Sequence, residues 1–225
     1  MPQTVPTSAL SAWALVLAAG EGRRWGGNKL MAPVGGRPLI SHVAATLAEA
    51  RRQGLLGGTV AVVSGVDAAL SRLLEEHGCR IAVNLAFASG LASSLRVGLI
   101  ALECLEGEPL PGAALIAPGD QPALSVDMIA RLVTAWRAGA GTVIRPRYAA
   151  RPQAPGHPVL LDRSRWALAD RLTGDVGLGP LLRDRPELVT TIEVPGDNPD
   201  LDTPADLIAF EKRLLDADHH STADT

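Results

Sequence analysis

Apolar runs of strand length alternate with longer stretches of helical periodicity along most of the chain. The runs that predict strands are residues 12–19, 59–64, 80–83, 113–118, 141–146, 158–161 and 188–194. The patterns that predict helices are residues 38–53, 67–77, 89–104, 125–138, 163–171 and 178–184, and a last helix begins at Pro204. Strands that alternate with helices form a mainly parallel sheet covered by helices. The pattern therefore predicts an α/β fold of the Rossmann-like kind.

The same pattern divides the chain into three parts. The alternation begins at about residue 12, which leaves residues 1–11 as an N-terminal extension. After residue 147 prolines and glycines become frequent, and we interpret the shorter elements that follow as an elaboration of the same domain, which covers residues 12–215. Residues 216–225 have no apolar periodicity and are predicted to be a flexible tail.

The composition narrows the class of protein. The chain has 225 residues, of which 47% are hydrophobic and 20% are charged, and its net charge is -3. These values suit one globular domain. The mild acidity argues against a nucleic-acid-binding protein, which would carry a basic excess. A polyanionic ligand would therefore have to be met by a local cluster of positive charge.

The cysteines and the N-terminus indicate a compartment. Cys79 and Cys104 lie far apart and outside any CxxC pattern, which is typical of ordinary buried thiols in a reducing environment. The N-terminal stretch has no basic n-region, and the apolar run behind it is too short to span a bilayer. We therefore expect a cytoplasmic protein with no membrane partner.

A glycine-rich and basic loop follows the first predicted strand, in the stretch LVLAAGEGRRWGGNKLMAPVGGRPLI. Its glycines let the backbone turn tightly, so that amide hydrogens can point at phosphate oxygens. Arg23, Arg24 and Lys29 add the positive charge that the rest of the chain lacks. The stretch predicts a phosphate-binding loop, although a plain turn with solvated arginines would also account for these residues.

Two well-known phosphate-binding motifs do not fit this loop. The GxGxxG motif of dinucleotide-binding folds fails because the third glycine, Gly26, comes one position late. The P-loop fails because, with Gly22 and Gly27 at its two glycine positions, Asn28 stands where its lysine belongs. The loop is therefore interpreted as a different device for holding a triphosphate.

Three aspartates are candidate metal ligands. Asp120 follows the predicted strand 113–118, at the carboxyl end where open α/β sheets bind ligands, although a role in the turn fits it equally. Asp200 and Asp202 are two positions apart in an extended segment, so both carboxylates would point to the same side. The segment 203–206 has the residues of a capped helix start, which leaves these two as magnesium candidates, with Asp202 favoured.

Other polar residues have both a functional and a structural interpretation. His157 follows Gly156 in a loop and could bind a substrate or be a partly exposed turn residue. Ser93 and Ser94 begin a helical pattern and could reach a base or phosphate, or only allow close packing. His42 falls inside a helical pattern, where a role in packing or at the surface is expected.

The glycine-rich stretch resembles the opening motif LAAGxGxRxGxxK of the nucleotidyltransferases, and of the MobA-like NTP-transferase family in particular. Further similar segments follow in the family's order: NLAFASGLASSLRVGL (84–99), IAPGDQP (116–122), GHPVLL (156–161), LTGDVGLGPLL (172–182) and DNPDLDTPADL (197–207). Together they span residues 15–210. The LAAG and GLASSL forms resemble molybdenum cofactor cytidylyltransferases more than the guanylyltransferases.

The resemblance implies a role for each matching residue and a nucleotidyltransferase fold. The residues implied to bind the nucleotide are Leu17, Ala18, Ala19, Gly20, Gly22, Arg24, Lys29, Gly90, Ser93 and Ser94. Among them Ala19 would favour cytosine over guanine. The residues implied to face the pterin are Gly156, His157 and Asp175. The residues implied to bind Mg²⁺, or Mn²⁺ in its place, are Asp120 and one of Asp202 and Asp200.

The reaction that the resemblance implies is the transfer of CMP from CTP to the phosphate of molybdenum-molybdopterin, with release of pyrophosphate. Lys29 and Arg24 would stabilise the developing charge. CTP and the molybdopterin cofactor would be the small-molecule partners, and a molybdoenzyme would receive the product. Gly179 stands where relatives have the arginine of GDxGAR, which favours two alternatives. These are another acceptor, such as a sugar or alditol phosphate, and a non-catalytic maturation factor that carries the cofactor.

Overall fold

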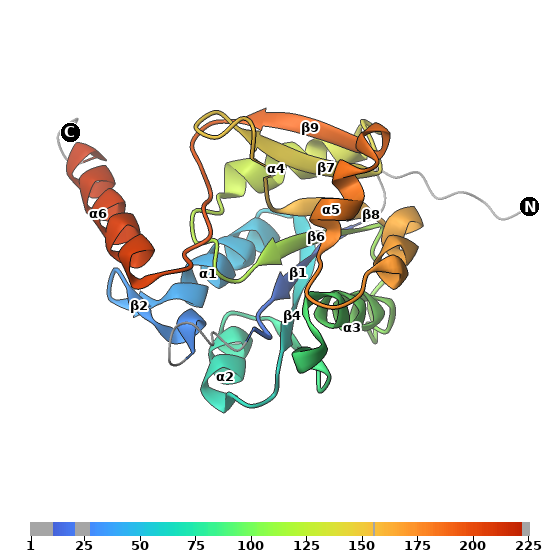
Figure 1. Cartoon of the computed structure of the whole chain (residues 1–225), viewed down its shortest axis with the longest axis horizontal. Helices are drawn as coiled ribbons and strands as arrows, with labels where there is room; N and C mark the ends of the chain where they lie inside the picture. Colours follow the sequence, from blue (N-terminus) through green and yellow to red (C-terminus); the bar gives the residue numbers. More distant parts are fainter. Residues whose placement is uncertain (1–10, 21–27, 155, 222–225) are drawn as a thin grey trace, which may run out of the picture.

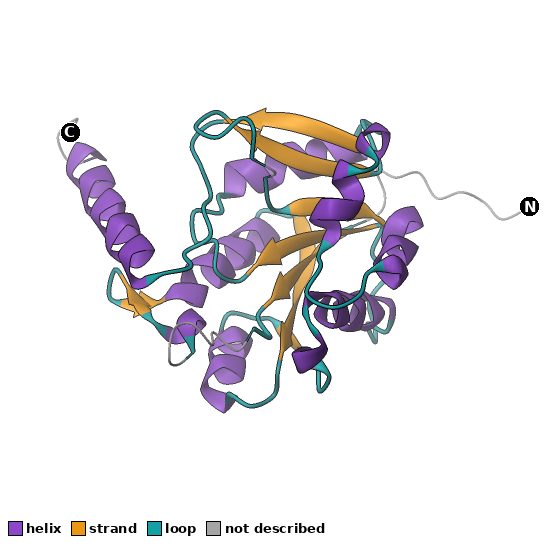
Figure 2. Ribbon diagram, viewed as in Figure 1, coloured by secondary structure: helices purple, strands orange, loops and turns teal. Residues whose placement is uncertain are grey.

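A seven-stranded sheet runs through the centre of the protein (Figures 1 and 2). The computed structural model describes residues 11–20, 28–154 and 156–221. Its strands are β1 (Ala12–Leu17), β4 (Leu56–Val63), β5 (Arg80–Val83), β6 (Ala113–Pro118), β7 (Val143–Tyr148), β8 (Val159–Asp162) and β9 (Val189–Val194). Its α-helices are α1 (Leu39–Arg52), α2 (Ala68–Glu76), α3 (Leu91–Glu103), α4 (Val126–Arg137), α5 (Leu178–Arg183) and α6 (Pro204–Ser221).

The strand order is β5-β4-β1-β6-β8-β7-β9. Strand β1 is paired in parallel with both β4 and β6, and β7 is paired in parallel with β9. Strand β8 is antiparallel to its two neighbours, β6 and β7. The prediction of a single α/β domain with a mainly parallel sheet is confirmed. The pairing of β1 with β6 brings the carboxyl ends of both strands to the same edge of the sheet, where Leu17 lies opposite Pro118.

Each face of the sheet has its own apolar core, and β1 contributes alternate side chains to both. Ala12, Ala14 and Val16 pack with the buried faces of α1, α2, α4 and α6. Trp13 and Leu15 point to the other side and pack with α3, α5 and the 3₁₀ helix η5 (Arg163–Arg171). This alternation is the two-residue period of a strand buried on both faces. Figure 1 shows α1 and α3 on opposite sides of β1.

A short hairpin before α1 was not predicted. Strands β2 (Pro33–Val34) and β3 (Arg37–Pro38) pair antiparallel, and Gly35 and Gly36 between them have φ of 56° and 77°. Two glycines with positive φ form the tight turn that hairpins prefer. The signal was present as a Gly-Gly pair between two short extended segments, but two-residue strands are too short for an apolar pattern.

The C-terminal helix is longer than expected. It starts where the sequence indicates, because Asp206 accepts hydrogen bonds from the backbone nitrogen (2.7 Å) and the hydroxyl (2.8 Å) of Thr203. This capping role of Asp206 is confirmed. The helix continues to Ser221, whereas a flexible tail was predicted from residue 216. Among the helices in the described ranges, none combines the length and apolarity needed to cross a membrane.

The two cysteines differ in environment. Cys79 is buried as predicted, and burial raises the pKa of its thiol to about 11. The prediction that Cys104 is buried is wrong, because this residue ends α3 and is exposed. Neither cysteine takes part in a disulfide.

His42 is buried in α1 and links that helix to the hairpin. Its Nε2 lies 3.0 Å from the carbonyl of Val34, so Nε2 donates, and its Nδ1 accepts from Nη2 of Arg37 at 3.1 Å. Burial and the charge of Arg37 lower the pKa of His42 from its ordinary 6.5, against the opposing effect of the Val34 carbonyl. The folded protein therefore prefers the neutral ring.

This preference predicts a pH-dependent stability. A pKa that is lower in the folded than in the unfolded state stabilises the fold above the unfolded value, and the contribution is lost as the pH falls through the folded value. We expect the melting temperature to fall between about pH 7 and pH 5, and less steeply in His42→Gln, whose amide can still donate to Val34. Thermal unfolding across this range measures both slopes. Equal slopes in the two proteins would contradict the role given to His42.

Candidate functional site

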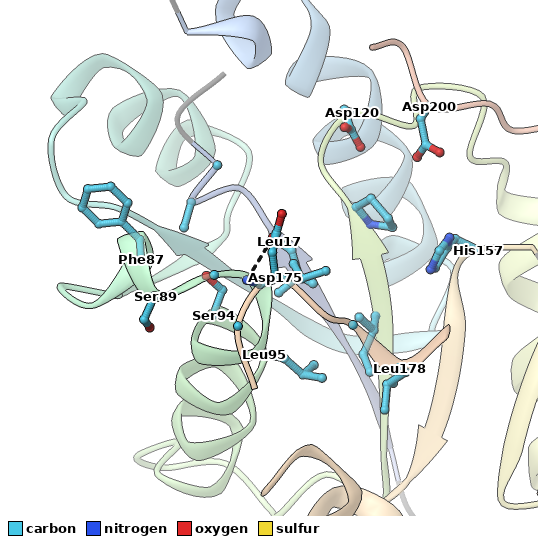
Figure 3. A pocket seen from close by; sticks show the side chains of 18 of the residues that line it. Leu17, Phe87, Ser89, Ser94, Leu95, Asp120, His157, Asp175, Leu178 and Asp200 are labelled. Atoms are coloured by element: carbon cyan, nitrogen blue, oxygen red, sulfur yellow. Dashed lines mark hydrogen bonds between the residues drawn. The ribbon is translucent and has the colours of Figure 1, made fainter. Parts of the chain in front are cut away.

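A pocket of ≈ 820 Å³ opens at the carboxyl edge of β1 and β6 (Figure 3). One wall is formed by Leu17 and the residues that follow β1, and another by the first turn of α3. The opposite side is formed by His157, by the segment 174–178 and by Asp200. Ligands in open α/β sheets bind outside the carboxyl ends of strands, so this is the place where a substrate is expected.

The residues after β1 lie at one end of this pocket. Leu17, Ala19 and Gly20 line it, whereas the backbone nitrogen of Ala18 is directed to the sheet and donates to the Val62 carbonyl at 2.9 Å. Within the described part of the chain, a side chain added at Gly20 would meet no atom within 4 Å. The predicted nucleotide-binding residues Gly22 and Arg24 lie outside the described residues.

Asn28 closes the glycine-rich stretch and ties it to α2. Its side-chain nitrogen donates to Asp67, the N-cap of α2, and its side-chain oxygen accepts from the Leu30 nitrogen at 3.1 Å. The hydrogen bond from Leu70 and then that from Asn28 lower the pKa of Asp67. The residue at the position of the P-loop lysine therefore has a structural task in this chain.

Lys29 lies between two of the predicted metal ligands. Its ammonium is 2.8 Å from Oδ2 of Asp120 and 2.8 Å from Oδ1 of Asp202, although the three residues are far apart in the sequence. The Leu201 nitrogen donates to the Asp120 carbonyl at 3.1 Å and so holds the second carboxylate near the first. Burial alone would lower the pKa of Lys29, but the hydrogen bonds and charges of Asp120 and Asp202 outweigh it and raise this pKa.

The two carboxylates that share Lys29 also fit a divalent cation. An ammonium bound by both shows that each directs an oxygen to a common point at which positive charge is favourable. In the described ranges no three His, Cys, Asp or Glu residues gather into a metal site. Mg²⁺ needs fewer protein ligands than that, because it keeps several waters and takes substrate phosphate oxygens. Asp120 and Asp202 would thus hold the metal together with a bound triphosphate.

Asp200 has a different environment from Asp202. It lines the pocket, and its Oδ1 accepts from the side-chain nitrogen of Gln121 at 2.6 Å. Figure 3 shows Asp200 beside Asp120 at one end of the pocket. The carboxylate of Asp202 instead faces Lys29 from a more exposed position, with 62% of its side chain accessible.

The first turn of α3 forms the wall opposite Asp120. Ser94 lines the pocket, whereas Ser93 does not and donates to the Gly90 carbonyl at 2.8 Å. The side-chain nitrogen of the buried Asn84 donates to both hydroxyls, at 2.8 Å and 3.0 Å. Adjacent helical residues point about 100° apart, so one of the two serines faces the ligand space and the other faces the loop before the helix.

Gly90 allows two walls of the pocket to meet. Its φ is 102°, and a Cβ built on it would lie 2.3 Å from the carbonyl carbon and oxygen of Gly174 and 2.5 Å from the backbone nitrogen of Asp175. The Ala92 nitrogen donates to the Gly174 carbonyl at 3.2 Å, and Oδ1 of Asp175 accepts from the Leu91 nitrogen at 3.4 Å. The segment with Asp175 is thus fastened to the start of α3 (Figure 3).

We expect Gly90→Ala to destabilise the protein and to disrupt the pocket. The substitution adds a steric clash with rigid backbone to an unfavourable φ, which together cost about 2–4 kcal/mol. Gly107→Ala is a matched control, since Gly107 has φ of 74° but no atom within 4 Å of an added Cβ. Denaturant unfolding of both variants measures the difference. Equal stabilities would show that the contact with Gly174 is relieved without cost.

His157, Asp175 and Leu178 also line the pocket, and Figure 3 shows His157 on the same side as Asp120 and Asp200. Gly156 does not line it, and its carbonyl accepts from Nε (3.2 Å) and Nη2 (3.0 Å) of the buried Arg145. Burial and the charge of Arg145 lower the pKa of His157, against the opposing charges of Asp200 and Asp120. The imidazole of His157 is therefore favoured in its neutral form.

Steric crowding does not explain why this chain has Gly179 where the resemblance implies an arginine. A Cβ added at Gly179 would meet no atom within 4 Å, so the backbone there has room for a side chain. Among the described residues that line the pocket, Lys29 is the one lysine or arginine.

Several residues of the site were missed by the sequence analysis. Gln121 is a buried residue that connects Asp200 to His157, and the buried Asn198 bonds to Gln121. Phe87, Leu91 and Leu178 form apolar walls. Gln121 and Asn198 lie inside the segments GDQP and DNPDLD, next to residues that were singled out. Arg145 gave no signal, because an arginine in a strand pattern is ordinarily exposed.

Comparison with known proteins identifies the family. Residues 14–189 match the family model described as the MobA-like NTP transferase domain. The nicotine blue oxidoreductase of Paenarthrobacter nicotinovorans is 34% identical over 190 residues, which are 80% of this chain and 85% of that protein. A probable molybdenum cofactor guanylyltransferase of Pyrococcus horikoshii is 26% identical over 179 residues, which are 78% of this chain and 83% of that protein.

The solved structure of Rv0371c from Mycobacterium tuberculosis H37Rv is similar over 91% of this chain and 99% of its own, with a TM-score of 0.72 and 26% identity. The same protein has also been solved in complex with manganese, with a TM-score of 0.70, 24% identity and the same coverage of both chains. The chain with this pocket therefore belongs to the MobA-like NTP transferase family, and its fold is that of the nucleotidyltransferases.

Proposed function

We propose that the protein transfers CMP from CTP to the terminal phosphate of molybdenum-molybdopterin and releases pyrophosphate, with Mg²⁺ or Mn²⁺ bound. The observation that carries this proposal is the position of Lys29 between Asp120 and Asp202 at the rim of the pocket. Nucleotidyl transfer needs cations around the phosphates and carboxylates that hold a metal, and this cluster supplies both kinds of group.

The transfer would be a displacement at the α-phosphorus of CTP. An oxygen of the acceptor phosphate forms a bond to this phosphorus, and the bond between the phosphorus and the bridging oxygen of the β-phosphate breaks. A phosphate nucleophile is already ionised, so the chain needs no general base. Lys29 would neutralise charge on the leaving pyrophosphate, together with Arg24. A metal on Asp120 and Asp202 would supply further positive charge to the phosphate oxygens.

Four residues bear on the choice of the base and of the acceptor. Ala19 is small, lines the pocket and belongs to the LAAG form of the cytidylyltransferases. His157 and Asp175 also line the pocket, and the acceptor would bind against them. Gly179 favours the alternative that the acceptor is another phosphate compound, because the arginine that would bind a further anionic group is missing.

Metal-dependent pyrophosphate release tests the proposal. CTP, GTP and ATP are offered separately, each with and without molybdenum-molybdopterin. We expect release with CTP and the acceptor together. Pyrophosphate release with GTP, but not with CTP or ATP, would replace cytosine by guanine as the base that the protein selects. If no pyrophosphate is released with any of the three nucleotides, although the protein still binds CTP, a non-catalytic maturation factor or another acceptor is favoured. Sugar phosphates and alditol phosphates are the next acceptors to offer.

A second candidate function is an oxidoreductase. It is favoured by the 34% identity with the nicotine blue oxidoreductase and by the apolar wall of Leu91, Leu95 and Leu178, which suits an aromatic substrate. A nicotinamide dinucleotide could use the same nucleotide end of the pocket. An oxidoreductase would oxidise such a cofactor when a quinonoid dye is added and would release no pyrophosphate. Dye reduction without nucleotidyl transfer would select this candidate.

The remaining expectations are proposals of the same kind. We propose a cytoplasmic location and a molybdoenzyme as the recipient of the product. Co-purification of the tagged protein with a molybdoenzyme would test the recipient, and fractionation would test the location.

A further inference from the structure

A buried amide connects two neighbouring residues that line the pocket, Asp200 and His157. The side-chain nitrogen of Gln121 lies 2.6 Å from Oδ1 of Asp200 and 3.4 Å from Nδ1 of His157. Its side-chain oxygen accepts from the side-chain nitrogen of Asn198 at 3.3 Å. Gln121 is 4% exposed and Asn198 is 5% exposed, so these contacts are shielded from water.

These contacts determine which way the amide of Gln121 faces. The side-chain nitrogen of Asn198 donates to the oxygen of Gln121. The carboxylate of Asp200 accepts and therefore requires the nitrogen on the other side. An amide nitrogen has two hydrogens, and the second is the one that faces His157. Nδ1 of His157 must then be an unprotonated acceptor.

Hydrogen bonds also hold the backbone at Gly156 and His157. The hydroxyl of Tyr148 donates to the His157 carbonyl, and Arg145 donates twice to the carbonyl of Gly156. A neutral imidazole with an unprotonated Nδ1 carries its hydrogen on Nε2. Because His157 lines the pocket, this leaves a fixed hydrogen-bond donor in the pocket wall (Figure 3).

We propose that Gln121 is a positioning residue that holds His157 as the Nε2–H tautomer, so that Nε2–H donates to the acceptor substrate. The acceptor would therefore present a carbonyl oxygen or an unprotonated ring nitrogen to His157. The same amide also binds Asp200, so one residue orders two neighbouring side chains of the pocket. The contact between His157 and the acceptor substrate rests on the proposed function, whereas the tautomer of His157 does not.

The tautomer can be measured directly on the full chain. Two-bond nitrogen–proton NMR correlations of protein labelled at the histidine ring nitrogens report which nitrogen carries the hydrogen, and His157→Asn identifies the signals of His157. At neutral pH we expect the hydrogen on Nε2 in the wild-type protein. In Gln121→Met, which keeps the length of the side chain but has no donor, we expect both tautomers. A hydrogen on Nδ1 in the wild-type protein, or an unchanged tautomer in Gln121→Met, would overturn the proposal.

Kinetics provide a second readout that a merely structural role would not give. In Gln121→Met the KM for the acceptor should rise about tenfold, the effect of one hydrogen bond, while the KM for CTP stays the same. Gln53→Met is the matched control, since Gln53 is exposed at the end of α1 and bonds only to Glu49 within that helix in the described contacts. An equal rise of both KM values would contradict the positioning role.

The two proposals fail in different ways. If the wild-type protein shows the Nε2–H tautomer but no nucleotidyl transfer, the proposed function is wrong and the positioning role of Gln121 stands. If transfer occurs but His157 carries its hydrogen on Nδ1, the positioning role is wrong and the proposed function stands.

Discussion

Replacement of Asp120 by asparagine is expected to lower the rate of nucleotidyl transfer about 10³-fold and to leave the fold intact. The substitution keeps the size of the side chain and removes the negative charge. It therefore removes one of two carboxylates that would hold the metal and one of two partners of Lys29. The side chain of Asp120 is 27% exposed, and Lys29 keeps Asp202, so the cost in stability should be small.

Asp127→Asn is the matched control for this variant. Asp127 is also a carboxylate paired with one basic residue, since its Oδ2 is 2.7 Å from Nε of Arg131, but it lies on the exposed face of α4. The control should keep wild-type transfer and a wild-type melting temperature. Full activity of a correctly folded Asp120→Asn variant would exclude Asp120 from the catalytic machinery.

Replacement of Lys29 by methionine should have the second large effect, with transfer lowered about 10²- to 10³-fold. The variant removes the one lysine or arginine among the described residues that line the pocket. If a metal binds Asp120 and Asp202 as proposed, the variant also removes its competitor, because the ammonium of Lys29 contacts one oxygen of each carboxylate. We therefore expect Mn²⁺ to bind the variant more tightly than the wild-type protein in the absence of nucleotide, although catalysis is lost.

Mn²⁺ binding is measured by electron paramagnetic resonance and transfer by pyrophosphate release. Lys212→Met is the control, since Lys212 is the other lysine of the chain and is exposed on α6. Weaker Mn²⁺ binding in Lys29→Met would contradict the assignment of Asp120 and Asp202 as a shared site for lysine and metal.

The fold could be predicted from the sequence because its elements are encoded locally. In β1 the apolar run is continuous, which is typical of a strand buried on both faces, and α4 begins with Ser125, whose hydroxyl accepts from the Met128 nitrogen at 3.2 Å. The direction of β8 could not be predicted in the same way. An antiparallel strand between two parallel ones depends on how the Pro- and Gly-rich segment before it crosses the sheet, and four residues carry no directional signal.

The candidate site was predictable in part for a similar reason. The rule that ligands bind at the carboxyl ends of strands was enough to single out Asp120, and the pairing of β1 with β6 brings it to Lys29. The sequence did not distinguish Ser94 from Ser93, since only the angle between neighbouring helical residues separates them. It also gave no sign of Gln121, because a buried amide network is a tertiary arrangement of residues that are commonly exposed.

The central claim is that a nucleotide is transferred to an acceptor and is not merely bound or hydrolysed. The most direct test follows CTP labelled at the α-phosphate in the presence of Mg²⁺ and molybdenum-molybdopterin. The account predicts that the label appears in a product of CMP joined to the acceptor phosphate, with one pyrophosphate released for each product formed. Label that remains in CTP, or that is recovered as free CMP, would contradict it.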